Sequence, residues 1–354
     1  MIYELALEGF RGIKKGRLEL FPMTVLLGAN NSGKTTVLEA LYLLYPPSPL
    51  CLSSYAAEPP GALSIVEVIH TYHKTLDSRG YRFLLHDYDG EAVIACRLSE
   101  TLRGLVLRAE ESWVKTHSPV ERSVGGYPNL EAFMSELRSM NLGGIYLRDS
   151  GTIGMRDRRP PKCLFVKLHL ADLAMCYVKR KWGLIRGRGL TGKIARKISK
   201  LVNEDYDDLT LEPHIGGGLS LNLILRETKV GIRLSDMGDG MRMLALAMLL
   251  WELSKADLLL WDDVEAFMSP SSLIYLSQWM SSLVERGAQV IVATHSREAA
   301  KLLAGAAEEA GHEARVVLLA LRDGVLKHRV LTVEEVEELE EAGVDVRMAE
   351  GFLL

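Results

Sequence analysis

The opening of the chain alternates apolar and polar positions in a way that predicts strands. Residues 2–8 and 16–20 follow this alternation, and residues 23–27 form a continuous apolar run typical of a buried strand. Residues 35–44 then follow a helical pattern, which Pro46 and Pro47 stop. The start of the chain is therefore expected to form two half-exposed strands, a buried strand and a helix.

Beyond a proline-rich break at residues 46–60, the pattern predicts an antiparallel meander and one amphipathic helix. The expected strands cover residues 64–73, 81–86, 91–98 and 103–109. The expected helix covers residues 128–140 with Asn129 near its start, and short strands are expected within GGIYL and CLFVKL. The loop at residues 148–162 is rich in Arg, Gly and Pro, which indicates an excursion from the main sheet.

The rest of the chain alternates helix and strand in the rhythm of a parallel sheet covered by helices. Two helices are expected at residues 170–182 and 191–202, joined by the glycine-studded link GLIRGRGLTG. The later elements are strands 208–214, 219–226 and 229–233, helix 239–254, strand 257–261, helix 270–286, strand 289–293, helix 296–309 and strand 315–321. We predict an α/β fold in three parts, residues 1–125, 126–205 and 206–354, of which the middle part is a helical, basic insertion.

Composition is ordinary for a soluble globular protein, with 48% hydrophobic and 25% charged residues in a chain of 354. Acids occupy the opening stretch where a secretion signal would be apolar, and the longest apolar run, residues 243–251, is too short to span a bilayer. We therefore expect a cytoplasmic protein without a membrane segment. The four cysteines form no C-x-x-C pair, so neither a zinc site nor a redox motif is indicated, and the scarcity of Gln and Asn beside plentiful Arg, Lys and Glu is typical of a thermophile.

One segment of the chain is strongly basic. Between residues 148 and 200, 15 Lys and Arg residues stand against three acids. Such an excess predicts a face for a polyanion, either DNA or an acidic protein partner. Tyr177 and Trp182 lie among the basic residues, where helical spacing favours a place in the core over stacking on bases.

The stretch VLLGANNSGKTT, residues 25–36, matches a phosphate-binding loop. It places four residues between Gly28 and Gly33 and continues with Lys34 and Thr35, between an expected strand and an expected helix. Glycines let backbone N–H groups turn toward a di- or triphosphate, and the helix N-terminus adds partial positive charge. Lys34 is expected to reach the β- and γ-phosphates, and the Thr35 hydroxyl is expected to ligate Mg²⁺.

Two later strands end in polar residues that belong with such a loop. The run ADLLLWDDVE places Asp262 where it can hold Mg²⁺, and Asp263 and Glu265 follow as candidates for the carboxylate that orients the attacking water. Strand 289–293 runs into ATHS, which places His295 at a neighbouring carboxyl edge, where an imidazole can sense the γ-phosphate. The alternatives are a solvated strand end and a structural histidine.

At these motifs the chain resembles the ATP-binding-cassette ATPases of the RecF, SMC and OLD kind, and most of all the small OLD-like AAA-type ATPases of prokaryotes. The resemblance covers nearly the whole chain and rests on GFRGIKKGRLEL, GANNSGKTTVLEAL, LSDMGDGMRMLALAMLLWEL, LLLWDDVEAFMSP, QVIVATHSREAAKLL and a terminal stretch containing GVDVR. It implies a P-loop fold with ATP and Mg²⁺ as cofactors. The residues implied to bind the nucleotide are Gly28, Asn30, Asn31, Ser32, Gly33, Lys34, Thr35 and Thr36, joined by a signature motif at Ser235, Gly238, Asp239 and Gly240. The family docks that signature onto ATP held by a partner subunit.

The chain departs from the family in three places. Asp263 is one methylene shorter than the usual Glu, the signature lacks its serine unless Ser235 serves, and no glutamine lies between the P-loop and the signature. The leading hypothesis is an ATPase that dimerises around ATP and transmits that closure to nucleic acid, a separate effector or a nuclease, in DNA repair or in defence against mobile elements. A transporter-type ATPase subunit and a nucleotide-switched binding module with little hydrolysis are the alternatives.

Overall fold

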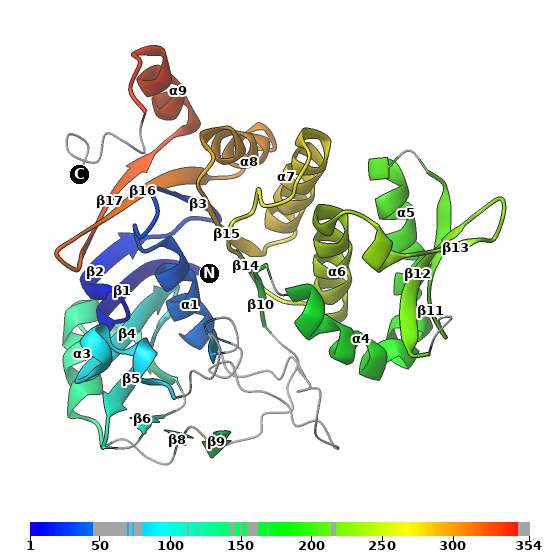
Figure 1. The fold of residues 1–354 in the computed structure, drawn as a ribbon. Helices are drawn as coiled ribbons and strands as arrows, with labels where there is room; N and C mark the ends of the chain where they lie inside the picture. The colour runs from blue at the N-terminus through cyan, green and yellow to red at the C-terminus, as the bar shows by residue number, and fades with distance from the viewer. Residues whose placement is uncertain are drawn as a thin grey trace.

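A computed structural model describes residues 1–44, 69–70, 73, 80–111, 113–117, 119–141, 145–148, 151–153, 162–168, 170–202, 204–213 and 217–345. Over these residues one long mixed sheet runs through the body of the molecule, with helices on its faces and a lobe at one side (Figure 1). The predicted α/β fold of the P-loop type, with an antiparallel N-terminal part, is confirmed.

The strands are β1 (Ile2–Phe10), β2 (Ile13–Glu19), β3 (Met23–Leu27), β4 (Glu91–Leu98), β5 (Thr101–Ala109), β6 (Val114–Thr116), β7 (Val120–Ser123), β8 (Ile145–Arg148), β9 (Gly151–Ile153), β10 (Cys163–Val166), β11 (Tyr206–Pro213), β12 (Leu219–Leu225), β13 (Gly231–Arg233), β14 (Leu258–Trp261), β15 (Gln289–Thr294), β16 (Ala314–Arg322) and β17 (Val325–Leu331). The main sheet has the order β10-β14-β15-β3-β16-β17-β2-β1-β4-β5-β6-β8-β9, and β7 pairs with β5. Strands β11, β12 and β13 form a second sheet.

The helices are α1 (Lys34–Leu44), α3 (Leu130–Ser139), α4 (Leu170–Gly187), α5 (Leu190–Val202), α6 (Asp239–Ser254), α7 (Pro270–Glu285), α8 (Arg297–Glu309) and α9 (Val333–Glu341). Short 3₁₀ turns occur at η1 (Arg82–Leu84), η2 (His86–Tyr88), η3 (Val124–Gly126) and η4 (Leu234–Asp236). Side chains cap several helix starts, as Asn129 does for α3 and Ser296 for α8.

The parallel part of the sheet is the core that positions the site. Strands β10, β14, β15, β3 and β16 pair with one another in parallel, and every residue of β3, β14 and β15 is buried. Continuous apolar runs of this kind suit strands that are covered on both faces. Because these strands run in one direction, the loops that follow β3, β14, β15 and β10 all open at the same edge.

The lobe combines α4 and α5 with the sheet of β11, β12 and β13, and α6 lies between it and the body (Figure 1). Helix α5 packs on β11, and both α4 and α5 pack on α6. Helix α3 lies instead on β4 and β5, where it forms a second small core. The division of the chain at residues 125 and 205 stays a prediction.

The strand expected at residues 81–86 is wrong, and the one expected at residues 64–73 lies mostly outside the described residues. Of residues 64–73, the structure describes 69, 70 and 73, and these are helical. Residues 81–86 fall in η1 and η2, because both edges of β1 are already paired, with β2 and β4, which leaves one isolated bridge between Phe10 and Leu85. The guanidinium of Arg82 donates to the carbonyl of Glu110 at 2.6 Å and fixes the turn.

The link expected between the two basic helices is mostly helical. Helix α4 continues to Gly187 and α5 begins at Leu190, so the reversal takes place at residues 188 and 189, where Gly189 has a φ of +64°. Burial of Ile185 and Leu190 holds both helix ends in place. The pattern also gave no indication of β17 and α9, of which β17 pairs with both β16 and β2 and joins the parallel to the antiparallel part of the sheet.

Candidate functional site

The loop between β3 and α1 has a backbone that only glycine permits at two positions. A Cβ on Gly28 would lie 2.5 Å from the carbonyl oxygen of Leu319 and 2.7 Å from the Ser32 hydroxyl. Gly33 has a φ of +94°, a value that side chains rarely adopt. The loop is therefore wrapped tightly around the start of α1, as a phosphate cradle requires.

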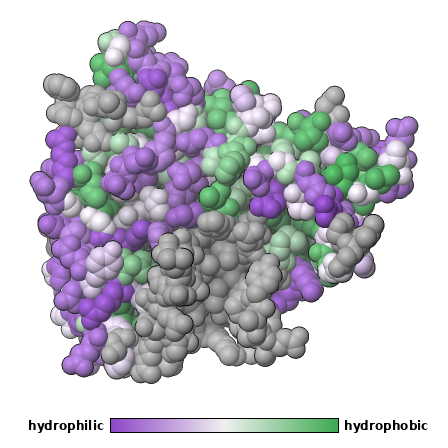
Figure 2. Space-filling view, viewed as in Figure 1, coloured by the Kyte–Doolittle hydropathy of each residue, from purple (hydrophilic) through white to green (hydrophobic). Residues whose placement is uncertain are grey.

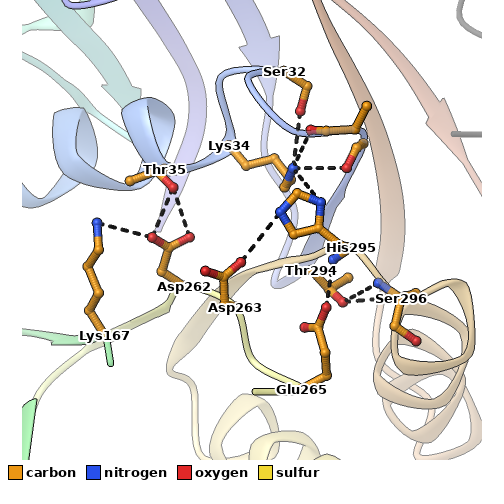
Figure 3. A network of polar contacts seen from close by, with 12 residues as sticks. Ser32, Lys34, Thr35, Lys167, Asp262, Asp263, Glu265, Thr294, His295 and Ser296 are labelled. Atoms are coloured by element: carbon orange, nitrogen blue, oxygen red, sulfur yellow. Dashed lines mark hydrogen bonds and ion pairs between the residues drawn. The ribbon is translucent and has the colours of Figure 1, made fainter. Parts of the chain in front are cut away.

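Lys34 is buried in this loop, and its ammonium is held by the loop itself (Figure 3). Its Nζ donates to the carbonyl oxygens of Gly28 at 2.9 Å and Ala29 at 2.8 Å, and to the hydroxyl of Ser32 at 3.2 Å. The ammonium thus lies inside the curve of the loop, where a phosphate would contact it.

The other predicted loop residues surround this centre. Asn30 and Asn31 are exposed at the tip, with Asn31 at a φ of +62°, while Ser32 and Thr36 are buried. Among the predicted binding residues of the loop, the two asparagines are the ones with exposed side chains.

Thr35 and Asp262 form a pair of oxygen ligands at the end of β14. The Thr35 hydroxyl donates to both carboxylate oxygens of Asp262, at 3.1 and 2.9 Å. Hydroxyl and carboxylate oxygens suit Mg²⁺, which commonly takes one or two protein ligands and completes its shell with phosphates and water. In the described part of the chain, no group of three or more His, Cys, Asp or Glu side chains is placed to hold a metal. The two side chains therefore fit Mg²⁺ that arrives with a nucleotide.

The sequence reasoning missed a buried charge network behind this pair. Lys167 follows β10, and its Nζ lies 3.3 Å from Asp262 Oδ2 and 3.4 Å from Oε1 of Glu39, a fully buried acid of α1. Glu39 also pairs with Arg11 and with His73 Nε2 at 2.6 Å. Burial lowers the pKa of Lys167, an effect that Asp262 opposes, and it lowers the pKa of Arg11 to about 10. The one signal in the sequence was an acid in the middle of an otherwise apolar helix.

His295 lies between Lys34 and Asp263. Its Nδ1 is 3.4 Å from Lys34 Nζ and its Nε2 is 3.6 Å from Asp263 Oδ1 (Figure 3). Because an ammonium only donates, Nδ1 must accept, which assigns the ring proton to Nε2 on the side of Asp263. Partial burial, together with the nearby carboxylates of Asp262 and Glu265, raises the pKa of Asp263. The raised pKa makes Asp263 a better proton acceptor than an ordinary aspartate.

Glu265 has a different position from Asp263. Its Oε1 accepts the backbone N–H of His295 at 2.8 Å, and its Oε2 is buried without a hydrogen-bond partner. Glu265 therefore fixes the loop that carries His295, whereas Asp263 faces the ring. The two candidates left open by the sequence therefore differ in their contacts.

Three of the signature residues, Gly238, Asp239 and Gly240, lie at the start of α6, beside the carboxylates of the same chain. Gly238 is the N-cap residue of the helix, and no side chain caps the first backbone N–H groups. A Cβ on Gly240 would lie 2.3 Å from the carbonyl oxygen of Phe267. Asp239 borders a cavity of about 280 Å³ that is also lined by Lys167, Asp262 and Asp263. Ser235, in contrast, is exposed and lines a separate cavity of about 290 Å³.

The basic segment is partly compensated by acids from other parts of the chain. Arg186 pairs with Asp208 at 2.5 Å, and Glu252 of α6 pairs with Lys193 at 2.6 Å and Lys197 at 3.5 Å. Tyr177 is buried and Trp182 packs on the core, as helical spacing had indicated. The outer face of the lobe mixes apolar and hydrophilic surface (Figure 2), and the exposed apolar side chains of its elements include Leu184 and Leu219.

The two stretches of the chain that build this site each match a known family model. Residues 1–74, which contain the P-loop, match the family model "AAA ATPase domain", and residues 183–299, which contain Asp262 and His295, match "AAA domain, putative AbiEii toxin, Type IV TA system". The chain is 36% identical over 114 residues to the uncharacterized protein MJECL11 of Methanocaldococcus jannaschii, a stretch that covers 31% of this chain and 99% of that protein. It therefore belongs to the same family as that archaeal protein.

A solved structure with the same fold is an Smc head bound to the C-winged helix domain of ScpA. The TM-score is 0.51 at 15% identity, and the match covers 95% of this chain and 99% of that chain. Over the described residues, no helix has the length and apolar character needed to cross a membrane. The chain is therefore similar to AAA ATPases over two separate stretches, which contain the P-loop and its carboxylate partner, and it shares its fold with an Smc head.

Proposed function

We propose that the protein binds ATP with Mg²⁺ and hydrolyses it, and that ATP joins two copies of the chain. The observation that carries this proposal is the convergence of Lys34, Thr35, Asp262 and His295 at the carboxyl ends of the neighbouring strands β3, β14 and β15. Open α/β sheets bind ligands at this edge.

Each residue has a role that its contacts support. Backbone N–H groups of the loop and the N-terminus of α1 would bind the phosphates, while the Lys34 ammonium would exchange its carbonyl partners for phosphate oxygens. Thr35 and Asp262 would hold Mg²⁺, which supplies positive charge that stabilises the phosphates during transfer. Asp263 would take the proton of the attacking water, and His295 would orient that carboxylate through Nε2.

Calorimetry with a nonhydrolysable ATP analogue tests the assignment. We expect Lys34→Ala to abolish binding, because the backbone N–H groups that remain in the loop cannot replace the charge of the ammonium. Lys162→Ala is a matched control, since Lys162 forms an exposed ion pair with Asp257 at the opposite end of β10. Unchanged affinity in Lys34→Ala would refute the nucleotide site.

The dimer proposal is supported by the open start of α6. Gly238 offers no side-chain cap, and the exposed N-terminus of a 16-residue helix attracts anions such as a γ-phosphate held by a second chain. Light scattering with and without the analogue tests it. A Cβ at position 238 would meet no atom within 4 Å, so Gly238→Glu should prevent the ATP-dependent increase in mass without disturbing the fold. A parent that stays monomeric with the analogue would contradict the proposal.

The lobe is proposed to receive the partner, either nucleic acid or an acidic effector protein. Exposed basic residues on α4 and α5 support the binding of a polyanion. The internal ion pairs of Arg186, Lys193 and Lys197 reduce the positive charge that the lobe presents to such a partner. Fluorescence anisotropy with duplex DNA over a salt series distinguishes the two. Reversing Lys179, Lys181, Arg196 and Lys200 to Glu should flatten the salt slope if DNA binds. The absence of binding at low salt would leave the protein partner, in DNA repair or in defence against mobile elements.

A further inference from the structure

Lys167 is placed between two buried acids that have different roles. The Asp262 side chain is 2% exposed, that of Glu39 is fully buried, and that of Lys167 is 17% exposed. The ammonium lies at nearly equal distances from them, 3.3 Å from Asp262 Oδ2 and 3.4 Å from Glu39 Oε1. This placement follows from strand order, because β10 is the parallel neighbour of β14 and both strands end at the same edge.

The two acids are not equally dependent on Lys167. Glu39 also pairs with Arg11 and His73, so it keeps partners wherever Lys167 moves. Asp262 is the residue that the proposed function assigns to Mg²⁺, and a divalent cation beside it would repel the ammonium. Lys167 can move away from Asp262 without losing its contact with Glu39.

We propose that Lys167 is a built-in counter-ion of Asp262 that a divalent metal must displace toward Glu39, so that this lysine sets the metal affinity of the site. The inference rests on the proposed function for the role of Asp262. The carbonyl of Lys167 accepts the N–H of Leu170 at 2.8 Å, so the residue is tied to the first turn of α4.

Binding of Mn²⁺ to the protein saturated with the nonhydrolysable ATP analogue, followed by electron paramagnetic resonance of the free ion, tests this inference. Lys167→Met keeps the length of the side chain and removes its charge, and it should tighten Mn²⁺ binding by about tenfold or more, since an ammonium no longer opposes the metal. Lys162→Met, which removes a lysine from the other end of the same strand, should leave the affinity unchanged.

A second variant separates displacement from a general change of charge. In Glu39→Gln, Lys167 loses the acid that receives it, so Mn²⁺ binding should weaken. In the Lys167→Met background the same Glu39→Gln change should weaken binding much less, because only the through-space loss of charge remains. Circular dichroism checks that each variant is folded, and if Glu39→Gln does not fold, the comparison of Lys167→Met with Lys162→Met decides alone.

The proposal is overturned if Lys167→Met binds Mn²⁺ with the parental affinity or more weakly, or if neither protein binds the ion. The affinity for the ATP analogue is measured separately by calorimetry. Intact nucleotide binding beside an unchanged Mn²⁺ affinity would therefore reject the role of Lys167 while leaving the proposed ATPase in place.

Discussion

The contrast between Asp263 and Glu265 gives the sharpest test of the proposed chemistry. Asp263→Asn keeps the size of the side chain, and its amide oxygen can still face His295 Nε2, which lies 3.6 Å from Asp263 Oδ1, so the shape of the site should be preserved. What the amide cannot do is accept the proton of water. We therefore expect nucleotide affinity to stay at the parental value and turnover to fall.

The size of the fall follows from the role assigned to the carboxylate. General-base catalysis contributes about 10²- to 10⁴-fold to rate, which corresponds to roughly 2.7 to 5.4 kcal/mol in the activation free energy. For Glu265→Gln, the amide oxygen can still accept the backbone N–H of His295, and an NH₂ group replaces an oxygen that is buried without a partner. A buried unpaired donor costs about 1–3 kcal/mol, so this change should lower the free energy of unfolding and reduce turnover by less than about tenfold.

Phosphate release at saturating ATP and Mg²⁺ gives the turnover numbers, and calorimetry with the nonhydrolysable analogue gives the affinities. Urea unfolding of both variants gives their stabilities. The reasoning is refuted if Glu265→Gln loses turnover by orders of magnitude while Asp263→Asn hydrolyses ATP at the parental rate. That result would transfer the role of base to Glu265.

Two further predictions follow from single side chains. The pKa of Asp263 is raised, and its charged form is the active one. Turnover should therefore be constant at higher pH and fall as the pH drops through that pKa, at a pH above the ordinary aspartate value of about 3.9. A pH–rate profile that is flat down to about pH 3.9 would contradict this prediction. The buried Gln289 side chain makes three hydrogen bonds with the backbone: it accepts the N–H of Ile2 and donates to the carbonyls of Ile2 and Phe21. Gln289→Leu should therefore lower the free energy of unfolding by about 3–5 kcal/mol, as measured by urea unfolding. Gln278→Leu, at an exposed position of α7, is the matched control and should change stability by less than about 0.5 kcal/mol.

The local signals of the sequence determined the elements and motifs between residues 239 and 321, although they gave no indication of β17 and α9 beyond them. Helix α6 begins and ends where its pattern predicts, and the strands that carry Asp262 and His295 lie within a residue of their expected bounds. The reason is that a continuous apolar run, a capping residue and a glycine-rich loop encode local structure within a few neighbouring residues. The phosphate-binding loop was readable for the same reason, since Gly28 and Gly33 are required by backbone geometry.

Contacts between distant segments were decided only by the tertiary structure. Strand order places β10 beside β14 and so brings Lys167 to Asp262, and the path of α4 and α5 brings Glu252 to the lysines of the lobe. The segment at residues 81–86 carries a strand-like pattern yet forms turns, because both edges of β1 were already occupied. The orientation of Asp263 and Glu265 around His295 was likewise decided only by the tertiary structure. Periodicity shows which side chains are buried, whereas the partner that each buried charge meets depends on how strands far apart in the sequence are ordered in the sheet.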